Sequence, residues 1–401
     1  MDFEATGLRS MRLPTRLDRY PAKMVSKLAD RLVDRYALGA ESILDPFCGS
    51  GAVLTAARRR DIRVTGLDVN PVAALFCQVK LNGFDSGKAE HLALRWLTKA
   101  QKSGIPLPVA WDAKHFWFTE GVLSKLEQLR AAAKSLRLAD THEGRALLLS
   151  YTLAIRLCSR ADQRSPKPFI SKQARDCRKG KHFDPYRVIS GLLKELCGLY
   201  GRTIDNGGSR FLLGDVASTL PAFDSADVHS HVITSPPYIN AQDYFRNFKL
   251  ELYLLEGILP FRVDSIKERF IGTERGNLLQ AVPADTREAH CSIVANLKDL
   301  ERADERLAAV VHRYLRDMSI AFCFMKRSLQ PGGCLVLVCG DNLIGGLRIS
   351  TWRVLEQLLR LRGFELFDRF ADPIGDRLLA PKRCGHKGLI KEEMVSAFRL
   401  S

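Results

Sequence analysis

Several features that often identify a protein are missing from this sequence of 401 residues. It has no apolar run near the roughly 18 residues that a membrane-spanning helix needs, so we expect no membrane association. Its first 20 residues lack the apolar stretch of a secretory leader, which predicts a cytoplasmic protein. Its ten cysteines include no pair spaced as CxxC, which argues against a zinc site or disulfide framework. We therefore expect reduced, buried thiols and no metal.

Acidic residues are also few relative to basic ones. The chain has 61 Lys and Arg against 45 Asp and Glu, a formal net charge of +16. Such an excess favours a polyanionic partner, with nucleic acid the first candidate. The other interpretation is a basic enzyme without such a partner. A chain of this length can bury a full α/β core and still carry an inserted domain.

The order of apolar and amphipathic segments predicts an α/β fold. Strand patterns occur at residues 42–45 and 63–69, with helical patterns before, between and after them. Residues 86–205 are mostly helical in character, and strand patterns resume at 210–216 and 227–238. Further strands are expected at 333–341, at 364–370 and in a last pair around RLLA and VSAFRL. This order predicts a seven-stranded, mostly parallel, Rossmann-like sheet with a large helical insertion.

Two acids and a glycine-rich turn follow the first three predicted strands. DPFCGSG at 45–51 lies where an open α/β sheet binds ligands, and Gly49 and Gly51 allow a sharp turn and close approach of the backbone. The turn is neither GxGxxG nor a P-loop, and alone it suits a dinucleotide site or a structural turn equally. Asp68 could accept both ribose hydroxyls of a ligand or cap the next helix. Asp215 could accept a bond from an adenine amine.

TSPPY at 234–238 follows an apolar strand. An amino group conjugated to a base ring is a poor nucleophile, and acceptors for its two hydrogens draw the nitrogen toward sp³ geometry. Consecutive prolines make a rigid turn whose carbonyl oxygens no strand uses. Ser235 Oγ and the Pro236 carbonyl could each accept one hydrogen, and Tyr238 offers a ring face to a flipped base. An isolated SPPY would favour a plain turn, but its position at a strand end favours catalysis.

These motifs resemble those of the amino-group DNA methyltransferases, whose shared patterns are DPFxGSG for the cofactor and [DNS]PP[YFW] for catalysis. YPAKM at 20–24 is similar to the cofactor-contacting segment that often precedes the glycine-rich turn. The resemblance covers the sheet but neither helical region. A first serine, as in TSPPY, is typical of the cytosine-N4 branch, whereas adenine-N6 enzymes more often have Asp or Asn.

The resemblance implies S-adenosyl-L-methionine as cofactor and double-stranded DNA as partner. It leaves open a partner restriction endonuclease or defence protein, the recognised sequence, and whether the chain is a monomer or a dimer. The implied catalytic residues are Ser235, Pro236, Pro237 and Tyr238. The implied cofactor-binding residues are Tyr20, Pro21, Lys23, Asp45, Pro46, Phe47, Gly49, Gly51, Asp68, Asn70 and Asp215.

The same reading divides the chain into five parts. They are the cofactor-binding half of the core (1–85), a helical insertion with a basic loop (86–205), the third and fourth strands with the catalytic motif (206–245), a second helical insertion (246–310) and the C-terminal part of the core (311–401). Either insertion could recognise DNA, and the sequence does not choose between them.

A basic run lies within the first insertion. Residues 156–181 hold nine Lys or Arg against two Asp, which fits either a solvated loop or a loop that contacts phosphates. The DNA-binding candidates are Arg160, Arg164, Lys167, Lys172, Arg175, Arg178, Lys179 and Lys181. The aromatic stretch 111–118 could stack on unpaired bases, but we expect it to be core.

Other activities share parts of this pattern. RNA base methyltransferases and protein glutamine methyltransferases use similar proline turns, and a DNA-binding partner that has lost catalysis would retain the charge. A carbon-5 cytosine methyltransferase needs a nucleophilic cysteine where this chain has Pro236–Pro237, and we interpret Cys48 as a packing residue. The sequence therefore predicts methyl transfer to an amino group, with N4 of cytosine as target and N6 of adenine as the alternative.

Overall fold

The computed structural model describes residues 20, 24–163, 165, 167–172, 183–202, 207–219, 228–239, 244–273, 282–374 and 392–401. The chain divides into two compact units, which we call the helical unit and the sheet unit. The helical unit comprises Met1–Ala22, Gln78–Ile204 and Arg246–Arg262. The sheet unit comprises Lys23–Cys77, Asp205–Phe245 and Val263–Ser401.

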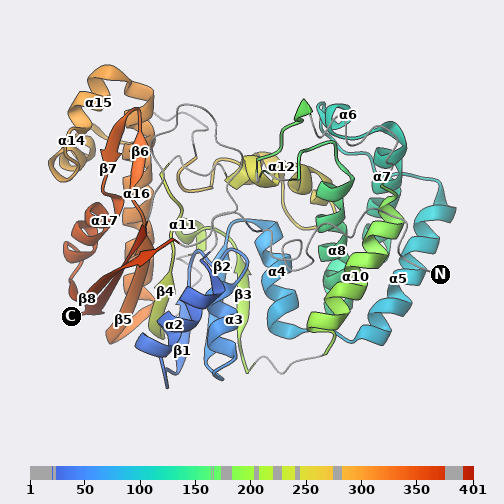
Figure 1. The fold of residues 1–401 in the computed structure, drawn as a ribbon, viewed down its shortest axis with the longest axis horizontal. Coiled ribbons are helices and arrows are strands. Elements are labelled where there is room, and N and C mark those ends of the chain that lie inside the picture. Colours follow the sequence, from blue (N-terminus) through green and yellow to red (C-terminus); the bar gives the residue numbers. More distant parts are fainter. Residues whose placement is uncertain are drawn as a thin grey trace. The chain divides into compact units, whose positions relative to one another are not determined.

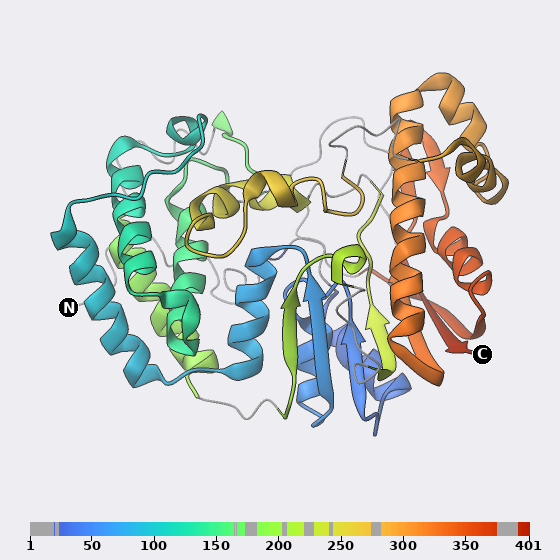
Figure 2. The ribbon, with the colours of Figure 1, turned by 180° about the vertical axis from the view of Figure 1, so that it is seen from behind.

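A seven-stranded sheet organises the described part of the sheet unit (Figures 1 and 2). Its strands in chain order are β1 (Ser42–Asp45), β2 (Arg63–Asp68), β3 (Arg210–Leu213), β4 (His229–Thr234), β5 (Leu329–Cys339), β8 (Phe364–Pro373) and β9 (Glu392–Leu400). Their order across the sheet is β3-β2-β1-β4-β5-β9-β8. The first five run parallel, and β9 is antiparallel to both of its neighbours. The predicted fold class is therefore confirmed.

The strand order reverses between β1 and β4. From β1 the chain builds β2 and β3 on one side, and it then returns to place β4 and β5 on the other side. Ile43 pairs with His231 and Leu44 with Val232 in parallel register. In open α/β sheets such a switch point opens a crevice at the carboxyl ends of the two strands. The turns after β1 and β4 are therefore placed where this fold binds ligands.

Helices accompany the sheet. They are α2 (Ser26–Tyr36), α3 (Ala52–Arg58), α4 (Pro71–Asn82, which ends in the helical unit), α11 (Val216–Thr219), α13 (Val263–Ile266), α14 (Ala284–Ile293), α15 (Leu297–Ala303), α16 (Glu305–Arg327) and α17 (Thr351–Arg360). Helix α2 packs on α3, and α16 packs on α17, while α2, α16 and α17 all contact β5. The long α16 runs beside β5 in both views (Figures 1 and 2).

The core of the sheet unit lies between strands and helices. All four residues of β1 are buried, and α16 buries a stripe that includes Val310, Tyr314 and Phe322. Burying one such large apolar side chain contributes about 1.5–3 kcal/mol. A separate hairpin of β6 (Asn342–Ile344) and β7 (Leu347–Ile349) was not predicted, because each arm has only three residues.

The helical unit contains α5 (Ser86–Ser103), α6 (Lys114–Trp117), α7 (Glu120–Ser135), a 3₁₀ turn η3 (Leu138–Asp140), α8 (His142–Cys158), α10 (Pro185–Tyr200) and most of α12 (Tyr244–Leu255). Asp85 and Thr141 cap α5 and α8 by accepting bonds from Lys88 N and Gly144 N. Helices α5, α7, α8 and α10 lie side by side (Figure 1). No helix in the described ranges has the length and apolar character to cross a membrane.

The aromatic stretch 111–118 lies partly in the core of this unit. Trp117 and Phe118 are buried, and Trp111 stacks on Tyr253 with ring centroids 4.5 Å apart. Phe116 is the exception, with 58% of its surface exposed. The predicted core position is therefore confirmed for Trp117 and Phe118 only, because Asp112, Ala113, His115 and Phe116 are exposed.

Candidate functional site

One hydrogen bond joins the two motifs across the switch point. Thr234, the last residue of β4, donates from Oγ1 to Asp45 Oδ1 over 2.6 Å. Thr234 is fully buried, and Asp45, the last residue of β1, is 3% exposed. The glycine-rich turn and the SPPY turn therefore begin from residues in direct contact. The role of Thr234 could not be predicted from TSPPY, because nothing in the sequence shows that its partner is Asp45.

Asp45 is held in a desolvated position. Besides Thr234, the Phe47 backbone N–H donates to its Oδ1 over 3.1 Å. Burial raises the pKa of Asp45 to about 7, and the bonds from Thr234 and Phe47 oppose that rise. Pro46 is buried and Phe47 is partly buried. Asp45 therefore titrates near neutral pH and responds to any charge brought to the crevice.

The turn after β1 uses its two glycines as predicted. Gly49 has φ +50° and Gly51 has φ +78°, values that side chains other than glycine rarely adopt. Gly51 directly precedes α3, and a Cβ there would stand 3.0 Å from Cys77 Sγ. The turn therefore depends on glycine for both its conformation and its close packing.

Asp68 ties the end of β2 to this turn. Its Oδ2 accepts a bond of 2.9 Å from Gly49 N, and its Oδ1 accepts one of 2.9 Å from Asn70 N. The Val69 backbone N–H also bonds this carboxylate, so of its roughly four acceptor sites about one is left for a ligand hydroxyl. Burial raises the pKa of Asp68 to about 6 against these backbone bonds. The alternative role of Asp68 as a helix cap is wrong, because Asn70 caps α4 by accepting from Val72 N over 3.0 Å.

Asp215, after β3, makes two contacts within the sheet unit. It accepts a bond of 2.9 Å from Ala217 N at the start of α11, and it forms an ion pair with Arg269. These contacts fix its carboxylate at the same edge of the sheet. Its role toward an adenine stays a prediction. The sequence analysis missed Arg269, which carries no motif of its own.

The SPPY turn is closely packed. Pro236 is buried, while Ser235 and Pro237 are partly buried. Tyr238 is 8% exposed, and its hydroxyl donates to Glu393 on β9. Burial first, and then the charge of Glu393, hold the pKa of Tyr238 well above its usual value. Tyr238 is therefore a neutral hydrogen-bond donor with most of its ring covered.

The segment after Tyr238 is anchored to the hairpin. Asn342 Nδ2 donates to the carbonyl of Ile239 over 2.9 Å, and Thr351 Oγ1 donates to Asn342 Oδ1 over 2.8 Å. All three residues are buried. Glu393 on β9 and Asn342 on β6 thus hold Tyr238 and Ile239 in place. Neither contact can be recognised from the spacing of residues in the sequence.

Tyr20 opens the first predicted cofactor segment and belongs to the helical unit, whereas Lys23 is counted with the sheet unit. Tyr20 is 7% exposed and packs against Phe248 with ring centroids 4.9 Å apart. Pro21 and Lys23 lie outside the described residues. The cofactor roles of these three residues stay predictions.

Three of the eight DNA-binding candidates are described. Arg160 and Lys172 are exposed and Lys167 is partly buried. The other five lie outside the described ranges: Arg164, Arg175, Arg178, Lys179 and Lys181. Arg160 also donates from its backbone to Trp117 O over 2.7 Å.

Arg156, the first residue of the basic run, does not fit the predicted phosphate-contacting loop. It is 5% exposed, and its guanidinium donates to the carbonyl oxygens of Ser165 and Asp162 over 2.7 and 3.4 Å. Inclusion of Arg156 in that loop was therefore wrong, because its charge is used to hold the turn after α8.

Cys48 is a packing residue, as predicted. It is 6% exposed and its sulfur lies 3.8 Å from that of Cys77, whose thiol donates to Gly49 O over 3.3 Å. Burial holds the pKa of Cys48 well above its usual value, so it is a thiol rather than a nucleophilic thiolate. Every cysteine in the described ranges is a free thiol.

The chain is similar in sequence to known enzymes. No family model matches the chain. Type II methyltransferase M.AvaI from Nostoc sp. is 24% identical over 400 residues, covering 89% of this chain and 80% of that protein. Type II methyltransferase M.BsoBI from Geobacillus stearothermophilus is 25% identical over 277 residues, covering 59% of this chain and 52% of that protein.

The chain also aligns with solved structures of other proteins, with low scores. TrmN from Thermus thermophilus aligns with 96% of this chain and 53% of its own at 10% identity and a TM-score of 0.31. The rRNA methyltransferase AviRa from Streptomyces viridochromogenes aligns with 98% of this chain and 94% of its own at 13% identity and a TM-score of 0.30. Scores this low carry no argument, and the fold rests on the strand order described above. In sequence, the chain is similar over most of its length to Type II methyltransferases.

Proposed function

We propose that the chain is an S-adenosylmethionine-dependent DNA methyltransferase that modifies an exocyclic amino group, with N4 of cytosine as its target. The observation that carries this proposal is the Thr234–Asp45 bond, which places the glycine-rich turn and the SPPY turn side by side at the switch point of the sheet. The similarity to Type II methyltransferases over 89% of the chain supports methyl transfer as the reaction.

The residues around the glycine-rich turn fit the proposed cofactor. Gly49 and Gly51 bring backbone rather than side chains to the crevice, and Asp68 keeps an acceptor site for a ribose hydroxyl. Asp45 and Asp68 also supply negative charge beside a cationic ligand. The cofactor supplies a methyl group on a positively charged sulfur. Asp45, Pro46, Phe47, Asn70, Asp215, Tyr20, Pro21 and Lys23 complete the proposed cofactor-binding set.

The SPPY turn would activate the amino nitrogen. Ser235 Oγ and the carbonyl of Pro236 would each accept one amino hydrogen, which localises the nitrogen lone pair for attack. The nitrogen gains positive charge as the methyl group is transferred, so these acceptors stabilise the transition state more than the ground state. Tyr238 would pack against the base, with its position set by Glu393. Pro237 keeps the turn rigid.

The net charge supports a nucleic-acid substrate. With a formal charge of +16, the chain would attract duplex DNA through its phosphates, and this attraction would position the duplex without specifying its sequence. We propose the basic run after α8 as one phosphate contact, and residues 86–205 and 246–310 as the recognition regions. A cytoplasmic location and a partner nuclease in a restriction system are part of the same proposal.

Sequencing of modified bases tests the proposal directly. The chain is expressed in a host free of DNA methylation, and the native DNA is read for modified bases. One recurring site carrying N4-methylcytosine is expected. N6-methyladenine would overturn the cytosine assignment and retain the class, whereas methylation of total RNA but not duplex DNA would overturn the substrate.

A single substitution tests the role of Ser235. In the Ser235→Ala variant, the turnover number should fall by about 10²-fold or more because one acceptor is lost in the transition state. The dissociation constant for the cofactor should stay within about twofold, since Ser235 lies outside the glycine-rich turn. A parallel loss of cofactor affinity and activity would contradict this role.

A further inference from the structure

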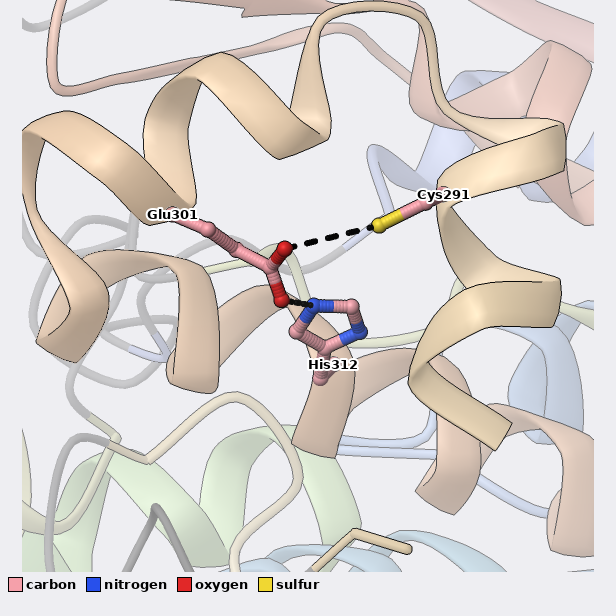
Figure 3. A group of neighbouring side chains, drawn as sticks. All are labelled: Cys291, Glu301 and His312. Atoms are coloured by element: carbon pink, nitrogen blue, oxygen red, sulfur yellow. Dashed lines mark hydrogen bonds and ion pairs between the residues drawn. The ribbon is translucent and has the colours of Figure 1, made fainter. Parts of the chain in front are cut away.

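Three successive helices of the sheet unit bring a thiol, a carboxylate and an imidazole together. Cys291 lies on α14, Glu301 on α15 and His312 on α16, and their side chains converge (Figure 3). His312 Nε2 lies 2.9 Å from Glu301 Oε1, and the Cys291 thiol lies 3.8 Å from Glu301 Oε2. One ligand atom from each residue falls within 4.8 Å of the other two. The Glu301 carboxylate thus accepts one hydrogen bond from His312 Nε2–H and one from the Cys291 thiol.

A fourth residue holds the imidazole from behind. His290 Nδ1 lies 3.1 Å from His312 Nδ1, and the two rings stack with centroids 5.3 Å apart. His312 is 1% exposed and His290 is 4% exposed. Because Glu301 can only accept, a neutral His312 carries its proton on Nε2, and its Nδ1 accepts a bond from His290 Nδ1–H. Histidines that ligate metals are almost always oriented in this way through their second nitrogen.

The donor set is that of a zinc site. Zinc binds thiolate sulfur, imidazole nitrogen and carboxylate oxygen at about 2.0–2.3 Å, which in a tetrahedron separates the ligand atoms by about 3.4–3.8 Å. In this structure one ligand atom from each residue lies within 4.8 Å of the other two, so a bound ion would draw the three side chains closer together. Cys291 must lose its thiol proton to become a ligand, so metal binding at this site would release a proton.

The charge around the cluster allows such a cation. A Cys291 thiolate and the Glu301 carboxylate together balance the charge of a divalent ion. The nearby Lys298 is paired with Glu288 over 2.6 Å, and Arg287 is the other cation close to the cluster. Because Lys298 already has Glu288 as its partner, the negative charge of Glu301 and of a Cys291 thiolate can be used for a bound cation.

We propose that Cys291, Glu301 and His312 bind a zinc ion, with His290 as the hydrogen-bond partner that orients His312. On binding, His312 would change tautomer, with its single proton moving from Nε2 to Nδ1, and His290 would carry its own proton on Nε2 so that its Nδ1 accepts the bond from His312. Three protein ligands leave a fourth coordination position for water. This proposal is independent of the proposed methyl transfer, because none of the four residues belongs to that site.

The absence of CxxC in the sequence argued against a zinc site, and it excludes only ligands that share one local turn. Here the ligands come from three helices, at intervals of ten and eleven residues. A bound ion would cross-link α14 and α15 to α16, the helix that packs on β5. The expected consequence is a metal-dependent stabilisation of this part of the fold.

Cobalt titration of the full chain tests the site. The protein is treated with a chelator, dialysed, and titrated with Co²⁺ and then Zn²⁺. We expect one Co²⁺ per chain with the visible absorption of a tetrahedral ion and a thiolate-to-cobalt band, both displaced by Zn²⁺. We also expect Zn²⁺ to raise the melting temperature. Absence of stoichiometric binding would overturn the proposal.

Matched variants locate the ion. Cys291→Ser should abolish the thiolate band, and Glu301→Gln should weaken Zn²⁺ binding by at least about tenfold, whereas Cys323→Ser, an exposed cysteine on α16, should change neither. His290→Gln should weaken binding by about 10–100-fold without removing the thiolate band. Circular dichroism of the metal-free variants shows that they are folded. Retention of the band in Cys291→Ser, or of full affinity in a folded Glu301→Gln, would overturn the assignment.

Discussion

Thr234 Oγ1 donates a hydrogen bond of 2.6 Å to Asp45 Oδ1, and through it the ends of β4 and β1 are joined at the switch point of the sheet. The contact is buried on both sides, so solvent does not replace it. Thr234, the first residue of TSPPY, therefore has a structural role, which differs from the proposed catalytic role of Ser235. The threonine couples the proposed catalytic turn to the proposed cofactor turn.

The Thr234→Val variant should be less stable and should bind the cofactor more weakly, because it loses the bond that joins these two turns. Valine retains the shape of threonine but leaves a buried carboxyl group without one donor, which costs about 1–3 kcal/mol of unfolding free energy. Loss of the bond should also raise the pKa of Asp45 further, because that bond now lowers it. Urea unfolding measures the first effect, and cofactor titration measures the expected weaker binding. Thr234→Ser, which retains the hydroxyl, should restore both, and equal losses in the two variants would contradict this account.

Cofactor affinity should increase with pH between about 5 and 8. Burial raises the pKa of Asp68 to about 6 and that of Asp45 to about 7, so both carboxyl groups are partly protonated at the lower end of this range. A cationic ligand with hydroxyl donors binds their ionised forms better, and its binding releases protons. Calorimetric titration at several pH values measures the slope.

The Asp68→Asn variant is the control for this pH dependence. It lacks one of the two titrating groups, so its affinity should be lower at pH 8 and should change less with pH. An unchanged slope in this variant would show that other groups carry the pH dependence.

Tyr238→Phe should impair catalysis while sparing cofactor binding. The change removes the hydroxyl that donates to Glu393 and leaves that partly buried contact unmade. The turn would then be held less firmly, and we expect a turnover number about tenfold lower with an unchanged cofactor dissociation constant. Tyr186→Phe is the matched control, since it removes a hydroxyl bonded to Gln128 in the helical unit. Equal effects of the two variants on turnover would contradict a local role for Tyr238.

The sequence predicted the structure best where a motif directly follows a short apolar strand. Gly49 and Gly51 take the backbone conformations that their turn requires, and the strands they follow were predicted from short apolar runs. Contacts between distant segments leave no such pattern. Glu393 follows Tyr238 by 155 residues, and Arg156 appears in a basic run although it is buried. Only the folded chain shows that Glu393 bonds Tyr238 and that Arg156 holds the turn after α8.

The described residues of the basic run after α8 should contribute to the salt dependence of DNA binding. Replacing Arg160, Lys167 and Lys172 together with glutamine removes up to three phosphate contacts, and each contact contributes about 0.9 to the slope of log affinity against log salt. The slope should therefore fall by up to about 2.7, with affinity for all duplex sequences reduced alike. Lys27→Gln, at an exposed position on α2, is the control and should leave the slope unchanged. Fluorescence anisotropy with cognate and unrelated duplexes at several salt concentrations measures both quantities. If the triple variant instead loses discrimination between the duplexes at an unchanged slope, these residues read bases rather than phosphates.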